Sequence, residues 1–421
     1  MLHSPNGCPY ASAQWIAENS QRADHDPRSD WCYCRNRYLL IPVSMESKAG
    51  ISEFLYGLLQ EVKEKGGSDL YLVAGSPPRM RLDGSLHLLE GAPLTPEILQ
   101  HWCHELYDLA REGIGGQPLR VGAERTMAVT VGHIGRFRCH VYRQRGSVAL
   151  TIRPIPHPIP SFDRLGLPTR LAEWIRPPRG GLLLVTGPPG SGKSTTLASI
   201  VDRINREQRV HIITLEDPLE FVHHHQRGLI SQREIGCDTN DLDSGLAALP
   251  GEAPDVVLLG ELMRPSSREA ALTLAETGCL VLASLSRASC IQALQQLVEE
   301  WPTSRQGAAR MQLAASLLAV LSQRLVPKRE GSGRVLALEL LVPTSGVRQA
   351  IREGKFTQVY SIMQTGQAKH GMQTLNQALC DLVIQRVISR TTAIATSYYP
   401  DELQAMLDRT KAKLHHPILS R

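Results

Sequence analysis

The residues best placed to do chemistry form one short run after an apolar stretch. Leu182 to Thr186 reads as a buried strand, and Gly187 and Gly192 follow before Lys193 and Ser194. A glycine-rich turn between a strand and a helix lets backbone N–H groups surround phosphate oxygens. Lys193 is expected to reach the β- and γ-phosphates of a nucleotide, and Ser194 to hold Mg²⁺. The predicted nucleotide-binding residues are Gly187, Pro188, Pro189, Gly190, Ser191, Gly192, Lys193, Ser194 and Thr195.

Two further apolar strands end in acidic residues. Val256 to Leu259 is apolar and leads through Gly260 to Glu261, which is typical of a strand that delivers a carboxylate beside bound Mg²⁺ and the γ-phosphate. Glu261 is therefore a candidate to orient or activate an attacking water. Ile213 to Pro218 ends in Glu216 and Asp217. From the residues alone, these two acids fit a turn as well as they fit a role beside a metal.

Length and composition limit the class of protein. The chain has 421 residues, of which 42% are hydrophobic and 21% charged, and its net charge is +5. These values predict two or three globular domains. The mild net charge does not indicate a nucleic-acid partner, which is usually met by a clustered basic face. No apolar run approaches the roughly 20 residues of a membrane helix, so we expect a protein that does not span a bilayer. Nine scattered cysteines favour a reduced, cytosolic compartment.

The elements that must position these residues divide into two groups. Helical spacing of apolar residues follows Ile51, a strand follows Ser68, and a second helix is expected near Pro96 to Leu109. The stretch from Thr126 to Ile155 alternates as β-strands do and contains several arginines. The proline-rich run from Pro154 to Pro160 predicts a linker. After this linker comes the second group of elements, which includes the glycine-rich run. Four of its leucines recur at helical spacing and are expected in the core, namely Leu313, Leu317, Leu318 and Leu321.

From about Ile51 to Arg390 the chain resembles the PilT/PilU family of type IV pilus retraction ATPases, within the secretion ATPase superfamily. The glycine-rich run is generic, but the ordered set of matching runs is specific to that family. The matching runs are Gly67-Ser68-Asp69-Leu70, Gly75-Ser76-Pro77-Pro78, Thr186 to Thr196, Thr214 to Phe221, Gln232-Arg233-Glu234, Ala275-Glu276-Thr277-Gly278, Ser322-Gln323-Arg324-Leu325, Val347 to Lys355 and Gly371 to Leu375.

The resemblance implies an α/β fold with a RecA-like P-loop core, preceded by a small PAS-like α+β domain. It implies Mg-ATP as ligand, catalytic Glu261 and Glu216, and phosphate-facing arginines. The candidates are Arg136, Arg138, Arg143 and Arg153, because a guanidinium fork suits phosphate. The alternative is that these arginines simply face water.

The same resemblance predicts the organisation of the chain and its partners. The domains expected are 1–44 as a divergent or disordered extension, 45–155 as the PAS-like domain, 156–165 as a linker, 166–395 as the ATPase domain and 396–421 as a C-terminal tail. Translation from Met45 is an alternative explanation of the first segment. The expected assembly is a homohexamer, or a mixed ring with an active paralogue. It is expected in the cytoplasm, bound to the inner membrane through the pilus platform protein, with no nucleic acid.

The chain departs from the family at groups that sense or stabilise the transferred phosphate. Ser286 stands where the family has a histidine, Met263 where it has an arginine after the strand glutamate, and Ala247 and Gly251 where it has arginines. Pro250 is expected to break the helix that contains these last two positions. Losing an arginine finger costs about 10³ to 10⁵ in turnover. The functions left open are a retraction motor for twitching motility, a weakly or non-hydrolysing accessory paralogue, and a type II secretion or conjugation ATPase.

Overall fold

The computed structural model describes residues 47, 48, 50–112, 124–176, 180–331 and 333–415. The predicted extension at 1–44 and residues 416–421 lie outside these ranges. Within them, no helix has both the length and the apolar character that crossing a membrane requires.

The N-terminal part is built around a six-stranded antiparallel sheet in the order β5-β4-β3-β8-β7-β6. Helices α2 and α3 pack on it through an apolar core that includes Leu55, Leu99 and Phe137. Its likeness to a PAS domain stays a prediction. Its elements are β1 (Ser47–Lys48), β2 (Ile51–Ser52), α2 (Glu53–Glu64), β3 (Asp69–Leu72), β4 (Arg79–Leu82), β5 (Ser85–Leu88), α3 (Pro96–Glu112), β6 (Arg125–Val131), β7 (Gly135–Gln144) and β8 (Ser147–Pro154).

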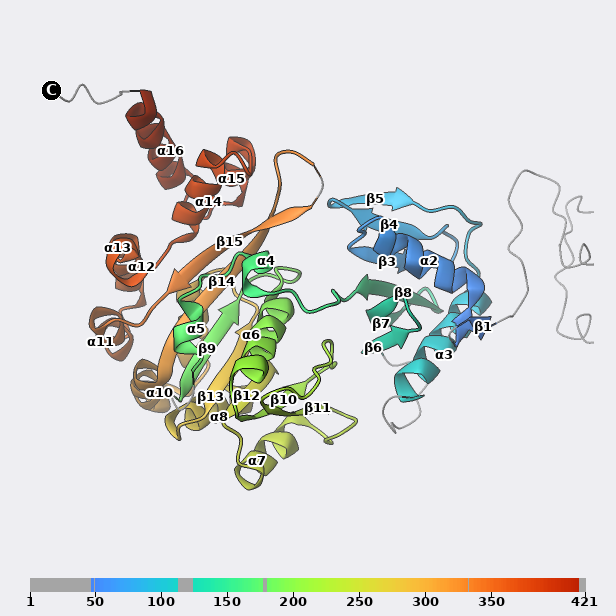
Figure 1. Cartoon of the computed structure of the whole chain (residues 1–421), viewed down its shortest axis with the longest axis horizontal. Helices are drawn as coiled ribbons and strands as arrows, with labels where there is room; N and C mark the ends of the chain where they lie inside the picture. The colour runs from blue at the N-terminus through green and yellow to red at the C-terminus, as the bar shows by residue number, and fades with distance from the viewer. Residues whose placement is uncertain (1–46, 49, 113–123, 177–179, 332, 416–421) are drawn as a thin grey trace, which may run out of the picture.

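The second part contains a seven-stranded sheet in the order β11-β10-β12-β13-β9-β14-β15 (Figure 1). All its strand pairs are parallel except β14 with β15. Its elements are α4 (Phe162–Leu165), α5 (Leu171–Trp174), β9 (Gly181–Thr186), α6 (Lys193–Glu207), β10 (His211–Glu216), β11 (Leu229–Glu234), α7 (Leu242–Glu252), β12 (Val256–Glu261), α8 (Pro265–Glu276), β13 (Leu280–Leu285), α9 (Cys290–Glu299), α10 (Thr303–Ser316), β14 (Leu317–Pro327) and β15 (Arg334–Leu341).

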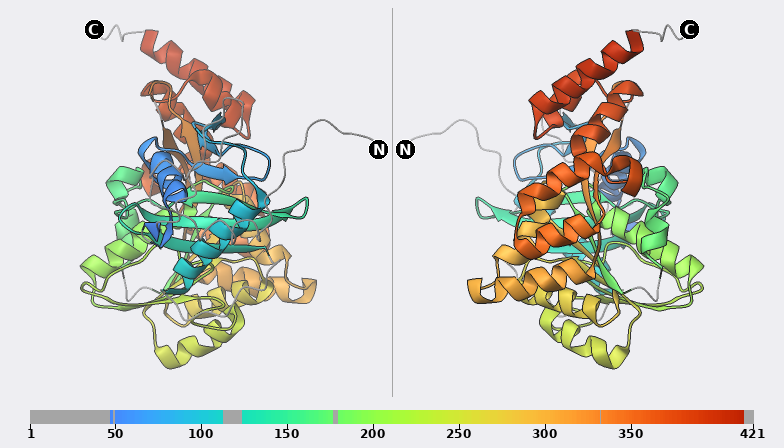
Figure 2. Two further views of the ribbon diagram at one scale, coloured as in Figure 1. Left: turned by 90° about the vertical axis from the view of Figure 1, so that its right-hand side faces the viewer. Right: turned by 90° about the vertical axis from the view of Figure 1, so that its left-hand side faces the viewer.

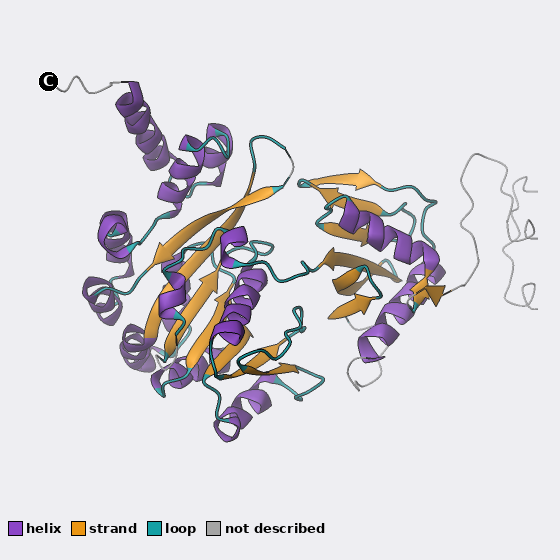
Figure 3. Cartoon of the chain, in the orientation of Figure 1, coloured by secondary structure: helices purple, strands orange, loops and turns teal. Residues whose placement is uncertain are grey.

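Helices cover both faces of this sheet (Figure 3), which explains why its central strands β9, β12 and β13 are largely apolar. Alternate residues of β9 serve opposite faces. Leu182 and Leu184 belong to the core beneath α8, α9 and α10, whereas Leu183 and Val185 pack against α6. The predicted α/β fold is confirmed, and the structure adds that its core sheet is largely parallel.

Further helices follow β15 and gather at one end of the molecule (Figure 2). Leu403 and Leu407 of α16 are buried in a separate apolar cluster with α14, so this segment packs as a helix. These helices are α11 (Ser345–Glu353), α12 (Phe356–Thr365), α13 (Gln367–His370), α14 (Leu375–Ile384), α15 (Arg390–Thr396) and α16 (Pro400–His415).

Two local predictions are wrong. Leu317, Leu318 and Leu321 do not lie in a helix, because α10 ends at Ser316 and β14 begins at the next residue. Leu317 and Leu321 are nevertheless fully buried, so only the element type was mistaken. A short apolar run fits the spacing of a helix as well as that of a strand. Here the residues form a strand, because β14 pairs with β9 on one side and with β15 on the other. Pro250 does not break α7, because it lies in the last turn, where few backbone hydrogen bonds remain to be lost.

Candidate functional site

The glycine-rich turn after β9 has the backbone shape of a phosphate cradle. Gly192 has φ +90° immediately before α6, a conformation that side chains disfavour. A Cβ on Gly187 would lie 2.5 Å from the carbonyl oxygen of Gln323 and 2.5 Å from Ser191 Oγ. Within the part of the chain that the structure describes, no side chain caps α6, so its first N–H groups are available to an anion.

Lys193 is folded back onto this turn. Its Nζ donates to the carbonyl oxygen of Gly187 at 2.8 Å and of Pro188 at 3.4 Å, and to Ser286 Oγ at 3.2 Å. Burial lowers the pKa of Lys193, and the nearby Glu261 carboxylate opposes that shift. The lysine is thus held by weak neutral acceptors, which a phosphate oxygen can replace with stronger charged ones.

Strand order brings Ser286 and Glu261 to the same edge of the sheet as the P-loop. β13 lies between β9 and β12, and Leu285 pairs with Thr186 at the ends of their strands. Because the carboxyl ends of parallel strands meet at one edge, Ser286 follows directly beside the turn. Glu261 is exposed at the end of β12, where a register shift separates it from Leu259.

Arg268 of α8 fixes the segment that follows Glu261. This side chain is only 1% exposed and forms an ion pair with Glu300. Its other guanidinium nitrogens donate to the carbonyl oxygens of Leu262 at 3.0 Å and Met263 at 2.9 Å. Met263 is itself 73% exposed, so the position where the family has an arginine faces outward.

The acids after β10 meet an arginine from the N-terminal sheet. Arg136 of β7 donates to the carbonyl oxygens of Leu219 at 2.6 Å and Glu220 at 2.9 Å. Burial lowers the pKa of Arg136, and the carboxylates of Glu234, Glu216 and Glu220 oppose the shift. Burial raises the pKa of Glu216 to about 7, and the neighbouring carboxylates of Glu220 and Glu234 raise it further.

The other candidate arginines have different surroundings. Arg138 forms an ion pair with Glu220, and its charge contributes to the lowered pKa of Lys193. Arg153 binds Asp69 of β3 through two nitrogens, at 2.9 and 2.6 Å. Arg143 is exposed near the turn between β7 and β8. Arg136 and Arg138 therefore lie on the side of the N-terminal sheet that contacts the P-loop part.

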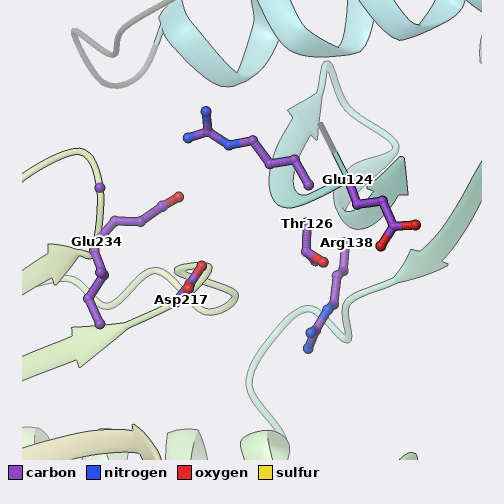
Figure 4. A pocket seen from close by; sticks show the side chains of 8 residues that line it. Glu124, Thr126, Arg138, Asp217 and Glu234 are labelled. Carbon is purple, nitrogen blue, oxygen red and sulfur yellow. The ribbon is translucent and has the colours of Figure 1, made fainter. Parts of the chain in front are cut away.

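A cavity of about 380 Å³ lies where the two sheets meet. Figure 4 shows Glu124, Thr126 and Arg138 on the N-terminal side of it, and Asp217 and Glu234 on the other. Burial raises the pKa of Glu234, and the Leu219 N–H and the charge of Arg136 oppose that shift. A small apolar cluster also joins the two parts, and its buried members are Ala128, Ile155, Ala198 and Phe221.

Hydrogen bonds hold each residue of the loop after β13, residues 286–289, in place. Thr186 Oγ1 donates to the carbonyl oxygen of Arg287 at 2.9 Å and accepts from its N–H at 3.1 Å. Ser289 caps α9, and the Cys290 N–H at the start of that helix donates to buried Glu339 at 3.0 Å. Burial raises the pKa of Glu339 to about 7.

Glu339→Gln is expected to remove a pH dependence of stability. A carboxyl with a raised folded-state pKa contributes stability that is fully present below its ordinary pKa of 4.5 and is lost as pH rises through about 7. For Glu339 that loss is on the order of 3 kcal/mol. Urea unfolding between about pH 5 and pH 8 should show the decline in the wild type and a flatter profile in the variant. Identical profiles would contradict it, and Glu299→Gln, on the exposed side of α9, is the control.

The residues of the turn fit a nucleotide. Ser191 Oγ is buried and has no hydrogen-bond partner among the described residues, and Gln323 Oε1 is likewise unpaired. Gln323 Nε2 donates to Thr196 Oγ1 at 2.8 Å, which fixes the first turn of α6 against β14. Pro189, Gly190 and Ser194 are exposed, so a ligand can reach them.

Sequence reasoning gave no role to Arg268 or Tyr398. Tyr398 OH donates to the carbonyl oxygen of Ala288 in the loop after β13, at 2.9 Å. Neither residue belongs to a motif with a known spacing, so no local pattern indicates them. A buried arginine on a helix and a tyrosine distant in sequence acquire their contacts only on folding.

Together, the parallel strands around β9 and the P-loop-type turn place the chain in the broad class of α/β proteins that bind nucleotides. The family of type II/IV secretion system proteins matches residues 165–413. The chain is 35% identical to the type IV pilus ATPase PilU of Pseudomonas aeruginosa, over 83% of this chain and 90% of PilU. It is 36% identical to the type IV pilus retraction ATPase PilT of the same organism, over 82% of this chain and 98% of PilT.

A solved structure agrees with these sequence comparisons. The crystal structure of the pilus retraction motor PilT with bound ADP matches this chain with a TM-score of 0.70 and a sequence identity of 42%. The match covers 83% of this chain and 98% of the PilT chain. The chain belongs to the type II/IV secretion ATPase family, and within it to the PilT/PilU-type pilus ATPases. The predicted resemblance is confirmed.

Proposed function

We propose that this chain is an ATP-binding motor subunit of type IV pilus retraction, which couples ATP hydrolysis to pilus disassembly and so serves twitching motility. The observation that carries the proposal is the P-loop of a chain in this family. Its Lys193 donates a hydrogen bond to Ser286, and the carboxylate of Glu261 is near enough to act on the charge of Lys193. The subunit works in the cytoplasm, in a hexameric ring held at the inner membrane by a platform protein.

The side chains around the turn have distinct roles in this proposal. The N–H groups of the turn and of the first turn of α6 bind the phosphates, and Lys193 leaves its neutral acceptors to pair with phosphate oxygens. Ser194 holds Mg²⁺, which supplies charge neutralisation when bound. Glu261 orients or activates the attacking water, and Glu216 supports it from β10. Arg136 and Arg138 face the phosphates after exchanging their contacts with the segment 219–220.

A second function, that of an accessory subunit in a mixed ring, is favoured by Ser286. A hydroxyl there meets Lys193, where the family has an imidazole. Ala247 and Gly251 are exposed on α7, one helical turn apart, so their side-chain positions are open to a neighbouring subunit. A subunit with Ala247 and Gly251 offers its neighbour no arginine at either position. In a mixed ring, the active paralogue would supply the missing arginines.

Deleting the gene in the organism that encodes the chain tests the proposal. We expect pilus retraction to be weakened, measured as a smaller twitching zone and restored by the intact gene, while type II secretion and conjugation proceed normally. Loss of secretion or conjugation with normal retraction would assign the chain to the other machines of the superfamily. Adding the purified chain to an active PilT-type relative separates the two roles, because an accessory subunit changes the relative's turnover.

A further inference from the structure

The C-terminal helices contact the nucleotide site through one phenol hydroxyl. Tyr398 lies in the turn between α15 and α16, and its hydroxyl donates to the carbonyl oxygen of Ala288 at 2.9 Å. The same carbonyl accepts from Ser322 Oγ at 3.1 Å. Ala288 is two residues after Ser286, whose hydroxyl meets Lys193.

Tyr398 is held firmly enough to position that loop. The guanidinium of Arg324 lies 4.3 Å from the centre of its ring, and Arg324 Nε donates to its hydroxyl at 2.7 Å. The turn itself is fixed by Asn376 of α14, which is 2% exposed. Asn376 Nδ2 donates to the carbonyl oxygen of Tyr399 at 3.0 Å and Asn376 Oδ1 accepts from Ser397 Oγ at 2.6 Å.

The turn is also bound to α12 on its other side. The rings of Tyr360 and Tyr399 are 5.0 Å apart, and Tyr360 OH donates to the Glu402 carboxylate at 3.1 Å. A displacement of the turn would therefore carry α12, α14 and α16 with it. Such packed helices move as bodies, because close-packed contacts tolerate little internal deformation.

We propose that Tyr398 is a positioning residue that sets the loop 286–289 against Lys193 and transmits a nucleotide-dependent shift of this loop to the C-terminal helices. The inference rests on the proposed function of the P-loop. The three donors of Lys193 Nζ all have acceptors, so a phosphate oxygen must displace at least one of them. In the proposed shift the displaced acceptor is Ser286 Oγ, and the loop then loses one of the contacts that hold it. The Tyr398 hydrogen bond to Ala288 then couples the loop to the turn after α15.

Tyr398→Phe tests this proposal, with Tyr399→Phe as the matched control. Each variant loses one phenol oxygen at adjacent positions, and Tyr398→Phe keeps the ring that packs on Arg324. We expect kcat for ATP to fall about threefold to tenfold in Tyr398→Phe with little change in KM, the range that losing one hydrogen bond predicts. Tyr399→Phe should retain the wild-type kcat.

Hydrogen exchange supplies a second measurement on the full chain. Adding Mg-ADP or Mg-ATP should change exchange in α15 and α16 of the wild type and Tyr399→Phe, and this response should be lost in Tyr398→Phe. If both variants behave alike in exchange, the proposal is overturned, whether or not the chain hydrolyses ATP. A wild type that binds no nucleotide would instead refute the proposed function, so the two failures are distinguishable.

Discussion

Replacing Lys193 with Ala is expected to lower ATP turnover by the full chain by about 10² to 10³, the cost of removing one preorganised donor from a developing charge. Lys193 is the one side chain of the turn that contacts both its backbone and Ser286. The variant keeps the glycine cradle and the start of α6, so its fold should persist. Steady-state phosphate release at saturating Mg-ATP measures the effect.

Glu261→Ala is the companion variant, because its carboxylate acts on Lys193 from β12. If turnover disappears in both variants, the chain is a working motor in which other groups replace the missing histidine and arginines. Tight Mg-ATP binding by the wild type, with turnover no higher than in either variant, would make it a nucleotide-bound accessory subunit. Turnover that survives both substitutions would contradict the assignment of the site.

Arg268→Met is expected to cause the largest loss of stability, about 3 kcal/mol. The change leaves the carbonyl oxygens of Leu262 and Met263 without their guanidinium donor, and it removes the nearer of the two arginines that pair with Glu300, the other being Arg287 at 3.9 Å. Leu262 belongs to the main core of the P-loop part, where unpaired polar atoms are costly. The midpoint of urea unfolding, followed by circular dichroism, measures the loss.

Arg305→Met is the control for charge alone. Arg305 pairs with Glu269 at 2.7 Å, but both side chains are about half exposed, and the methionine can still cover Trp301. Exposed pairs are worth less than about 1 kcal/mol, so the midpoint should hardly move. Equal effects of the two substitutions would show that burial of Arg268 carries no special cost.

Local features of the site could be read from the sequence because they depend on short-range rules. The turn from Gly187 to Ser194 has the glycines and the basic residue that a phosphate cradle requires, and it lies between a strand and a helix as predicted. The strand that ends in Glu261 was also found from its apolar run. The element type of residues 317–321 could not be found in this way, because an apolar run does not distinguish a buried strand from a buried helix.

Contacts between distant segments were decided only by the tertiary structure. The sequence named four arginines without choosing among them; the folded chain brings Arg136 and Arg138 to the acids after β10 and pairs Arg153 with Asp69. Arg268 and Tyr398 acquire partners through packing of helices onto the sheet edge. The sequence by itself determined where a glycine-rich turn lies between a strand and a helix, since that property belongs to local backbone and side-chain chemistry. Which side chains meet across the site depends on strand order and helix packing, and these depend on the burial of the whole apolar core.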